Sequence, residues 1–376
     1  MTDSTGSKEL TKVIAERICA STLKAIPFRD YMELCLYQEP FGYYRNSAIK
    51  IGKEGDFYTS SSVSPLMGEM IASYLIKQWR AHFDQVERIF VVEWGGGNGR
   101  LALHVLDELR EQEPQLYKRL AYTMIESSSY HRGLQQETLL AHTGKVNYLD
   151  EQDWLQAVPD QGVFVLANEL LDAFPVHRIC LLNGLWHESY VSWEEEQGSF
   201  KELWLPLQEG RLLTYISQYK PLSVLLEGQI AEINLAAMDW IGSVARRIGE
   251  GQLILIDYGD TAEELYAGHR MRGTLMCYRK HLAYDDPFIY VGEQDITAHV
   301  NFSACVAAGE AEGMTALKLQ TQREFLVEQG ILEKLMNHFD PDPFSPVAKK
   351  NRGIRQLLLS DQMSELFKVL ILTKKR

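Results

Sequence analysis

Short apolar runs alternate with amphipathic segments through the middle of the chain. The runs at 89–92, 121–125, 163–167 and 252–256 predict buried strands, because each holds four or five mostly apolar residues. Apolar residues at helical spacing over 100–111 predict a helix between the first two strands. Strands that alternate with helices are typical of a mostly parallel sheet with helices on both faces. The pattern therefore predicts an α/β, doubly wound domain.

Segments on either side of this alternation extend the domain. Residues 8–25 predict a short helix, and Ser64 followed by Pro65 predicts the start of another. A serine side chain accepts hydrogen bonds from the free N–H groups of a first helical turn, and proline suits that turn. Apolar runs at 315–320 and 367–373 predict two further strands. We therefore expect a discontinuous domain that closes on its last strand.

Residues 176–206 interrupt the alternation. Asn183 and Gly184 predict a tight hairpin turn, because both residues accept the positive φ angles of a primed turn. A long helix is predicted over about 227–249, with Gly251 as its stop. The expected domains are an N-terminal helical extension at 1–60, a discontinuous wound domain at 61–175 and 251–376, and an antiparallel hairpin and helical insertion at 176–250.

Composition and charge exclude several functional classes. The 376 residues carry a formal net charge of −13, so neither a nucleic acid nor an anionic membrane is the expected partner. The sequence has no run of about 18 apolar residues, and its N-terminal segment lacks the apolar stretch of a secretory signal. Five cysteines without a CxxC pair argue against a disulfide framework and against a zinc site. We therefore expect a cytoplasmic protein with no metal.

A glycine-rich turn follows the first predicted strand. Glycine permits a tight turn and a close approach of ligand to backbone, and ligands bind at the carboxyl ends of such strands. One interpretation is the GxGxxA dinucleotide fingerprint at Gly97, Gly99 and Ala102. The other is a GxGxG run at Gly95, Gly97 and Gly99, preceded by Glu93. A carboxylate at that strand end attracts the cationic amino-acid end of S-adenosylmethionine but repels a pyrophosphate, which favours the second interpretation.

A second carboxylate follows the next predicted strand. Glu126 comes directly after 121–125, where an acidic side chain can accept hydrogen bonds from both ribose hydroxyls of a nucleoside. Dinucleotides and S-adenosylmethionine both contain a ribose, so Glu126 indicates a nucleoside site without choosing between them. The competing interpretation is that Glu93 and Glu126 only cap the ends of strands.

Motifs in a fixed order extend from residue 27 to the C-terminus. They are Tyr31-Met32 with Gly42-Tyr43-Tyr44, Gly55–Ser60, Gly68-Glu69, the glycine-rich turn, Asn168–Pro175, Asp257-Tyr258-Gly259, Gly273–Leu275 with Tyr278 and His281, Asp295–His299, Gln322–Gly330 and Phe367–Leu370. With these motifs the chain resembles the methyltransferases that include the mitochondrial complex I assembly-factor arginine methyltransferase and its bacterial relatives.

The resemblance implies a seven-stranded class I methyltransferase fold with extra segments. It also implies S-adenosyl-L-methionine as cofactor and a loop over that cofactor at 55–60, a segment that the residues alone would predict as a simple turn. The family's Glu-Leu-Gly-Pro-Gly-x-Gly loop is Glu-Trp-Gly-Gly-Gly-Asn-Gly at 93–99 here, and its aromatic pair after Asn-Glu is Leu170-Leu171. These departures concern the substrate more than the cofactor. The expected cofactor-binding residues are Gly55, Asp56, Thr59, Ser60, Glu93, Gly95, Gly97, Gly99 and Glu126.

Polar residues that follow the 163–167 strand are the candidate catalytic residues. They are Asn168, Glu169 and Asp172. Methyl transfer requires a nucleophile held in line with the methyl group, and a carboxylate can both orient a guanidinium and accept its proton. The competing interpretation is that Asp172 caps a following helix and that Glu169 is structural.

The sequence thus predicts a methyltransferase that modifies arginine on a partner protein. Three alternatives remain: a small-molecule methyltransferase, a cofactor-binding assembly factor that acts by binding a client, and a nucleotide-dependent oxidoreductase. The oligomeric state is open, with a homodimer as one option. His281 and His299 enter as site residues only through the resemblance.

Overall fold

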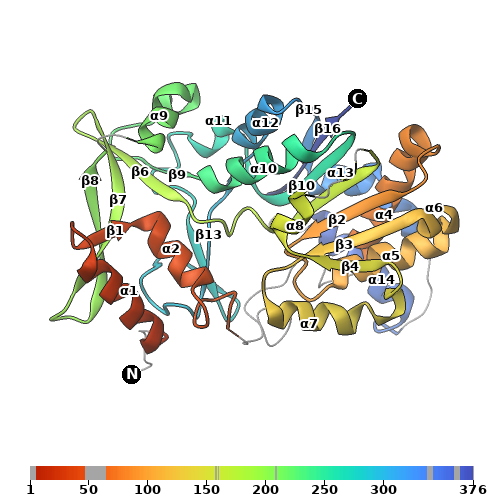
Figure 1. The fold of residues 1–376 in the computed structure, drawn as a ribbon, viewed down its shortest axis with the longest axis horizontal. Coiled ribbons are helices and arrows are strands. Elements are labelled where there is room, and N and C mark those ends of the chain that lie inside the picture. The colour runs from red at the N-terminus through yellow and green to blue at the C-terminus, as the bar shows by residue number, and fades with distance from the viewer. Residues whose placement is uncertain are drawn as a thin grey trace. The chain divides into compact units, whose positions relative to one another are not determined.

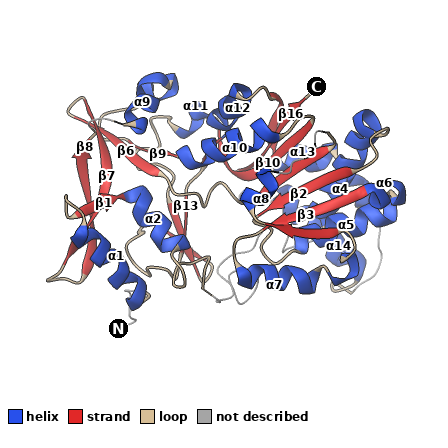
Figure 2. Ribbon diagram, in the orientation of Figure 1, coloured by secondary structure: helices blue, strands red, loops and turns tan. Residues whose placement is uncertain are grey.

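The computed structural model describes residues 6–46, 65–156, 159, 161–207, 210–336, 342–359 and 365–375. The chain divides into two compact units, each assembled from three segments. Unit 1 comprises Met1–Phe57, Leu171–Trp240 and Gly259–Cys305, and unit 2 comprises Tyr58–Leu170, Ile241–Tyr258 and Val306–Arg376. Figure 1 shows the elements of each unit in chain colours, and Figure 2 separates helices from strands.

Unit 2 is built on a mixed sheet. Along the sheet the strands run in the order β15-β16-β10-β5-β2-β3-β4, and β14 pairs with the last two residues of β10, Gly259 and Asp260, which like β14 belong to unit 1. Neighbours from β10 to β4 are parallel, whereas β16 is antiparallel to both β10 and β15. The strands are β2 (Ile89–Trp94), β3 (Leu120–Ile125), β4 (Val146–Leu149), β5 (Val163–Asn168), β10 (Gly251–Asp260), β14 (Val300–Asn301), β15 (Thr315–Thr321) and β16 (Phe367–Lys374).

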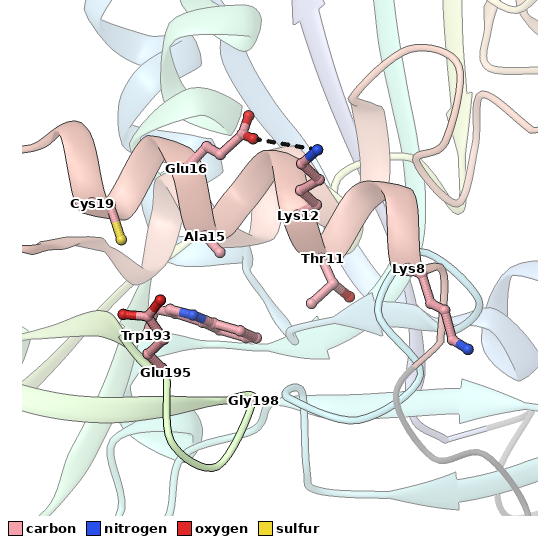
Figure 3. A pocket seen from close by; sticks show the side chains of 9 residues that line it. All are labelled: Lys8, Thr11, Lys12, Ala15, Glu16, Cys19, Trp193, Glu195 and Gly198. Atoms are coloured by element: carbon pink, nitrogen blue, oxygen red, sulfur yellow. Dashed lines mark ion pairs between the residues drawn. The ribbon is translucent and has the colours of Figure 1, made fainter.

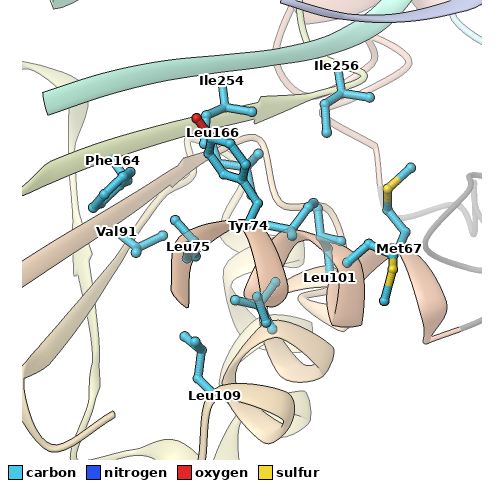
Figure 4. Close-up of a cluster of buried hydrophobic side chains, with 14 of the residues drawn as sticks. Met67, Tyr74, Leu75, Val91, Leu101, Leu109, Phe164, Leu166, Ile254 and Ile256 are labelled. Atoms are coloured by element: carbon cyan, nitrogen blue, oxygen red, sulfur yellow. The ribbon is translucent and has the colours of Figure 1, made fainter. Parts of the chain in front are cut away.

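Helices cover this sheet. Buried side chains from α4, α5, α13 and α14 form one apolar core with the sheet, in which Val91, Phe164 and Ile254 face Leu75 and Leu101 (Figure 4). On the opposite face the ring of Trp154 from α8 packs edge-on against Trp94 of β2, with 4.8 Å between centroids. The helices are α4 (Leu66–Gln78), α5 (Arg100–Gln112), α6 (Pro114–Arg119), α7 (Ser129–Thr138), α8 (Glu151–Gln156), α10 (Leu235–Arg247), α12 (Phe302–Ala311), α13 (Gln322–Glu328) and α14 (Pro346–Leu359), with short turns of π or 3₁₀ helix at Trp79–Phe83, Leu140–His142 and Ile331–Lys334.

Unit 1 contains two antiparallel sheets. The larger has the order β1-β7-β6-β9, with β8 along the other side of β7, and the smaller has the order β12-β11-β13. An aromatic cluster of Phe28, Tyr31, Phe200 and Phe288 lies in its core. The elements are α1 (Lys8–Ala20), β1 (Ala25–Pro27), α2 (Phe28–Tyr37), β6 (His177–Leu182), β7 (Leu185–Glu194), β8 (Ser199–Pro206), α9 (Arg211–Gln218), a 3₁₀ turn (Lys220–Val224), β9 (Ile230–Ile233), α11 (Ala262–Leu265), β11 (Met276–Arg279), β12 (Leu282–Tyr284) and β13 (Asp295–Thr297).

The structure confirms an α/β architecture, the strands of the alternating segment and the predicted hairpin. Asn183 and Gly184 have φ angles of 53° and 72°, as a primed turn requires. The helix predicted at 8–25 ends at Ala20, and Ala25–Pro27 is a strand. Ser64 lies outside the described residues, and the helix that it was expected to open begins at Leu66.

The long helix predicted over about 227–249 is wrong in its first third. Residues Ile230–Ile233 pair with β6, and the two β-branched isoleucines suit a strand. The helix begins only at Leu235, because the side chain of Asn234 accepts a 2.8 Å hydrogen bond from the N–H of Ala237 and so starts the first turn. Among the described residues, none of the helices has the length and apolar content needed to cross a membrane.

Glycine at the start of β10 gives a test of the sheet. A Cβ atom on Gly251 would lie 2.1 Å from the backbone oxygen of Val163 in β5, which cannot move without breaking the ladder. We expect Gly251→Ala to lower the free energy of unfolding by about 3 kcal/mol. Gly133→Ala in α7, where no atom lies within 4 Å of the new methyl group, should raise it by up to about 1 kcal/mol. Urea denaturation measures both, and equal stability of the two variants would contradict this packing.

Candidate functional site

The glycine-rich turn joins β2 to α5 at the carboxyl edge of the sheet. Gly95, Gly97 and Gly99 adopt φ angles of 62°, 51° and 79°, the left-handed region that favours glycine. Space is short as well: a Cβ on Gly95 would lie 2.9 Å from Cδ1 of Leu170, and one on Gly96 would lie 2.4 Å from Cε of Met124. The turn therefore presents bare backbone at the ends of β2, β3 and β5.

Glu93 lies directly beneath this turn. The carboxylate is 2% exposed, and it accepts a 2.6 Å hydrogen bond from the hydroxyl of Tyr122. A Cβ on Gly96 would come within 2.9 Å of Oε1 of Glu93. Burial raises the pKa of Glu93 to about 7; the Tyr122 hydrogen bond opposes the rise, and the negative charge of Glu126 adds to it. A cation bound over the turn would stabilise the ionised form of this carboxyl group.

Glu126 lies at the end of β3 and is also buried. Its Oε1 accepts from the N–H of Ser128 at 2.8 Å, and its Oε2 accepts from Nε2 of Gln135 at 3.3 Å. The same Nε2 donates to the carbonyl of Gly97 at 3.0 Å, so Gln135 connects Glu126 to the glycine turn. Gln135 is one of two adjacent glutamines in a polar helix, and no pattern in the sequence marks it as a site residue.

A buried acceptor beside these groups provides a test of the expected cofactor. Oε1 of Gln135 is buried and has no hydrogen-bond partner among the residues that the structure describes. A buried polar atom without a partner destabilises a protein unless a ligand satisfies it. Ribose hydroxyls are donors, and the carboxylate of Glu126 and the amide oxygen of Gln135 are acceptors. The residues present therefore fit the ribose of an S-adenosyl nucleoside.

The end of β5 brings Asn168 and Glu169 together. Nδ2 of Asn168 donates to Oε1 of Glu169 at 3.1 Å, and the N–H of Glu169 donates to the carbonyl of Ile256 at 2.8 Å. Glu169 has a φ angle of 52°, which is uncommon for a residue other than glycine and is typical of functional sites. Leu170 follows and reaches Gly95, so this strand end abuts the glycine turn.

Asp172 belongs to unit 1 and has different neighbours. The residue is 6% exposed, and its backbone carbonyl accepts from the N–H of Ala298 at 3.0 Å. Burial, together with the charges of Asp295 and Asp172, raises the pKa of Tyr37 and of Tyr44. No helix lies between Asp172 and the start of β6 at His177, so the interpretation of Asp172 as a helix cap is wrong.

The other residues predicted for the site include those of the 55–60 loop and His299. Gly55, Asp56, Thr59 and Ser60 lie outside the described residues. Burial, and next the charge of Arg270, lowers the pKa of His299 to about 4, so this imidazole is neutral near pH 7.

A separate groove of about 490 Å³ lies within unit 1, between α1 and the turn that joins β7 to β8 (Figure 3). Trp193 lies on the side of the groove opposite Ala15 and Cys19, and its ring packs against Phe200 with 4.9 Å between centroids. Trp193 is therefore half-buried, and it contributes to the packing of the hairpin as well as to the groove.

Curated proteins similar to this chain share one description. A protein of Drosophila melanogaster named protein arginine methyltransferase NDUFAF7 homolog, mitochondrial, is 27% identical over 95% of this chain and 84% of its own length. The Xenopus laevis protein arginine methyltransferase NDUFAF7, mitochondrial, is 25% identical over 91% of this chain and 80% of its own length.

The predicted cytoplasmic location is contradicted by these relatives, which are named as mitochondrial proteins. The prediction was based on free cysteines and on the N-terminal residues. Free cysteines distinguish reducing from oxidising compartments, and they do not distinguish one reducing compartment from another.

Two comparisons cover the fold and the cofactor. A COG1565 superfamily member from Burkholderia thailandensis, solved with bound S-adenosyl-homocysteine, is 31% identical and superposes with a TM-score of 0.85 over 98% of this chain and 92% of that one. A family model described as S-adenosyl-L-methionine-dependent methyltransferase matches residues 70–320, about two thirds of the chain. The chain therefore belongs to the S-adenosyl-L-methionine-dependent methyltransferase family.

Proposed function

We propose that this methyltransferase modifies an arginine side chain of a partner protein, at the end of β5. The observation that carries the proposal is the contact between two strand ends. Leu170 lies against Gly95, so the carboxylate of Glu169 and the glycine turn share one edge of the sheet. The names of the relatives, which are protein arginine methyltransferases, support arginine as the acceptor.

The chemistry divides between cofactor and protein. When bound, S-adenosyl-L-methionine supplies an electrophilic methyl group on a sulfonium. A guanidinium must lose a proton to become a nucleophile, and free arginine holds its proton with a pKa above about 12. Glu169 would align the guanidinium through paired hydrogen bonds and accept that proton, while Asn168 holds Oε1 in place. Asp172, which belongs to unit 1, stays a prediction as a second carboxylate.

The cofactor residues have separate proposed roles. Glu93 would attract the cationic amino-acid end, Glu126 and Gln135 would accept from the ribose hydroxyls, and the backbone of the glycine turn would lie against the cofactor. Gly55, Asp56, Thr59 and Ser60 stay predictions for a loop over the cofactor.

We also propose the seven-stranded class I arrangement for unit 2. The order β4-β3-β2-β5-β10-β16-β15, with only β16 antiparallel to its neighbours, supports this arrangement. In a doubly wound sheet a ligand binds where the strand order reverses, which is between β2 and β5 here. The expected insertion at 176–250 would contribute to choice of the protein substrate, and self-association into a homodimer stays a prediction.

Cofactor affinity should depend on pH through Glu93. The ionised form predominates only above about pH 7, so affinity for S-adenosyl-homocysteine should fall by up to about tenfold per pH unit below that value. Glu93→Gln should remove the dependence. Tyr122→Phe should move its midpoint upward, because the hydrogen bond that favours the ionised form is lost. Isothermal titration between about pH 5.5 and 7.5 measures this, and a flat profile in the wild-type protein would contradict the role of Glu93.

Glu126 gives a test of the ribose site. Glu126→Gln replaces an acceptor oxygen with a donor group, and affinity for S-adenosyl-homocysteine should fall by about tenfold to a hundredfold. Glu137→Gln, an exposed position on α7, is the matched control and should bind like the wild-type protein. Equal affinity of the two variants would move the ribose away from Glu126.

Substitution of the candidate catalytic carboxylates tests the proposed function itself. Glu169→Gln and Asp172→Asn should keep the affinity for S-adenosyl-L-methionine and should lower methyl transfer, by about a hundredfold for Glu169 as general base. The acceptor is a protein captured from a lysate on the Glu169→Gln variant. Peptide mapping after incubation with wild-type enzyme and cofactor should place a methyl group on arginine.

Glu196→Gln, at the exposed β7–β8 turn, is the control for this experiment and should leave transfer unchanged. Methylation of another residue type would refute arginine as the acceptor. Wild-type rates in both carboxylate variants would return Glu169 and Asp172 to structural roles.

A further inference from the structure

The segment after β5 leaves the sheet in a strained conformation. Pairing between β5 and β10 ends with Asn168 opposite Ile256. At the next residue, Glu169, φ is 52°, and a residue with a Cβ atom adopts this left-handed region only where its surroundings hold it there. The structure must therefore contain interactions that fix Glu169, the residue with the proposed catalytic carboxylate.

Two hydrogen bonds to acceptors at Ile256 and Asp257 of β10 fix this segment. The N–H of Glu169 donates to the backbone carbonyl of Ile256 at 2.8 Å. The N–H of Leu170 donates to Oδ2 of Asp257 at 3.2 Å. A side-chain carboxylate therefore accepts the hydrogen bond that a backbone carbonyl would accept in a continuing β-ladder. The N–H groups of Glu169 and Leu170 thus donate to two consecutive residues of β10.

The carboxylate of Asp257 is itself held in place. Asp257 is 1% exposed, and its Oδ1 accepts a 2.9 Å hydrogen bond from the N–H of Tyr258. Each carboxyl oxygen therefore accepts from one backbone N–H. A buried carboxylate with both oxygens engaged is a rigid support for Leu170.

We propose that Asp257 is a positioning residue for methyl transfer, which holds the strained Glu169–Leu170 segment so that the carboxylate of Glu169 faces the methyl acceptor. The proposal rests on the proposed function of Glu169. Asp257 acts on the backbone through Leu170, and Asn168 acts on the side chain through Oε1 of Glu169. Together they fix the two degrees of freedom, backbone and side chain, that decide where the carboxylate points.

The test is Asp257→Asn, which keeps the size of the side chain and replaces one acceptor oxygen with a donor. The new amide group cannot accept from both Leu170 and Tyr258, so one of the two hydrogen bonds must break. We expect kcat for methyl transfer to fall by about tenfold to a hundredfold, as small misplacements of a catalytic group do. Affinity for S-adenosyl-homocysteine and the KM for the cofactor should stay at wild-type values.

The matched control is Asp260→Asn on the same strand. Oδ1 of Asp260 accepts from the N–H of its own neighbour Thr261 at 2.8 Å, as Asp257 does from Tyr258, and Asp260 lies four residues beyond Ile256, where pairing with β5 ends. This variant should retain wild-type transfer. If Asp257→Asn does not fold, Asp257→Ser, which keeps one acceptor oxygen, replaces it.

Amide hydrogen exchange gives a readout that does not depend on the acceptor. Exchange at Leu170 should be faster in Asp257→Asn than in the wild-type protein and unchanged in Asp260→Asn. Unchanged exchange at Leu170 would overturn the proposal. This outcome is separate from failure of the proposed function, which would appear as wild-type transfer by Glu169→Gln with faster exchange still present in Asp257→Asn.

A double variant distinguishes positioning from general stability. If Asp257 acts through Glu169, the Glu169→Gln, Asp257→Asn protein should transfer no more slowly than Glu169→Gln alone. Multiplicative losses in the double variant would overturn the proposal. A parallel fall of cofactor affinity, unfolding temperature and kcat in Asp257→Asn would also overturn it, because that pattern indicates a structural role.

Discussion

Parallel pairing of β5 between β2 and β10 is the constraint on which the site depends. Ala167 of β5 pairs with Trp94, the last residue of β2, and Asn168 pairs with Ile256 of β10, which continues to Asp260, so β2 and β5 end within about one residue of each other. The segments that leave them must pass through a shared small volume. This crowding explains the glycine at position 95, where a side chain would meet Leu170, and the left-handed backbone of Glu169.

Burial of acidic groups at this edge gives the site its charge. Glu93 and Glu126 are each less than a tenth exposed, and the pKa of Glu93 is raised to about 7. Desolvation makes an ionised carboxylate costly, and a bound cation offsets that cost. S-adenosyl-L-methionine brings a cationic amino-acid end and ribose hydroxyls, which complement an acid at the end of β2 and acceptors at the end of β3. A pyrophosphate would add a negative charge to the same edge.

Much of the architecture was predictable because the wound sheet is buried on both faces. Its central strands are short apolar runs, and the glycine turn and the Asn183-Gly184 hairpin have direct conformational causes. The strand at Ile230–Ile233 could not be assigned from its four residues alone, since its partner in β6 lies some fifty residues earlier. Local propensity does not contain that pairing.

The site was predictable only in part, for a related reason. Residues adjacent to strand ends, such as Glu93 and Glu126, follow from the position of the strand. Gln135 and Asp257 form hydrogen bonds with partners that are distant in sequence, at Gly97 and Leu170, and an isolated glutamine or aspartate position carries no pattern of its own. The assignment of compartment failed because residue composition reports redox state and charge, and neither identifies an organelle.

The most direct measurement is a crystal structure of this chain with S-adenosyl-homocysteine. The account predicts ribose hydroxyls within hydrogen-bond distance of Glu126 and Oε1 of Gln135, the ammonium group above Glu93, and the sulfur atom directed toward Asn168 and Glu169. A ligand whose sulfur atom points away from the end of β5, or whose ribose contacts neither Glu126 nor Gln135, would contradict it.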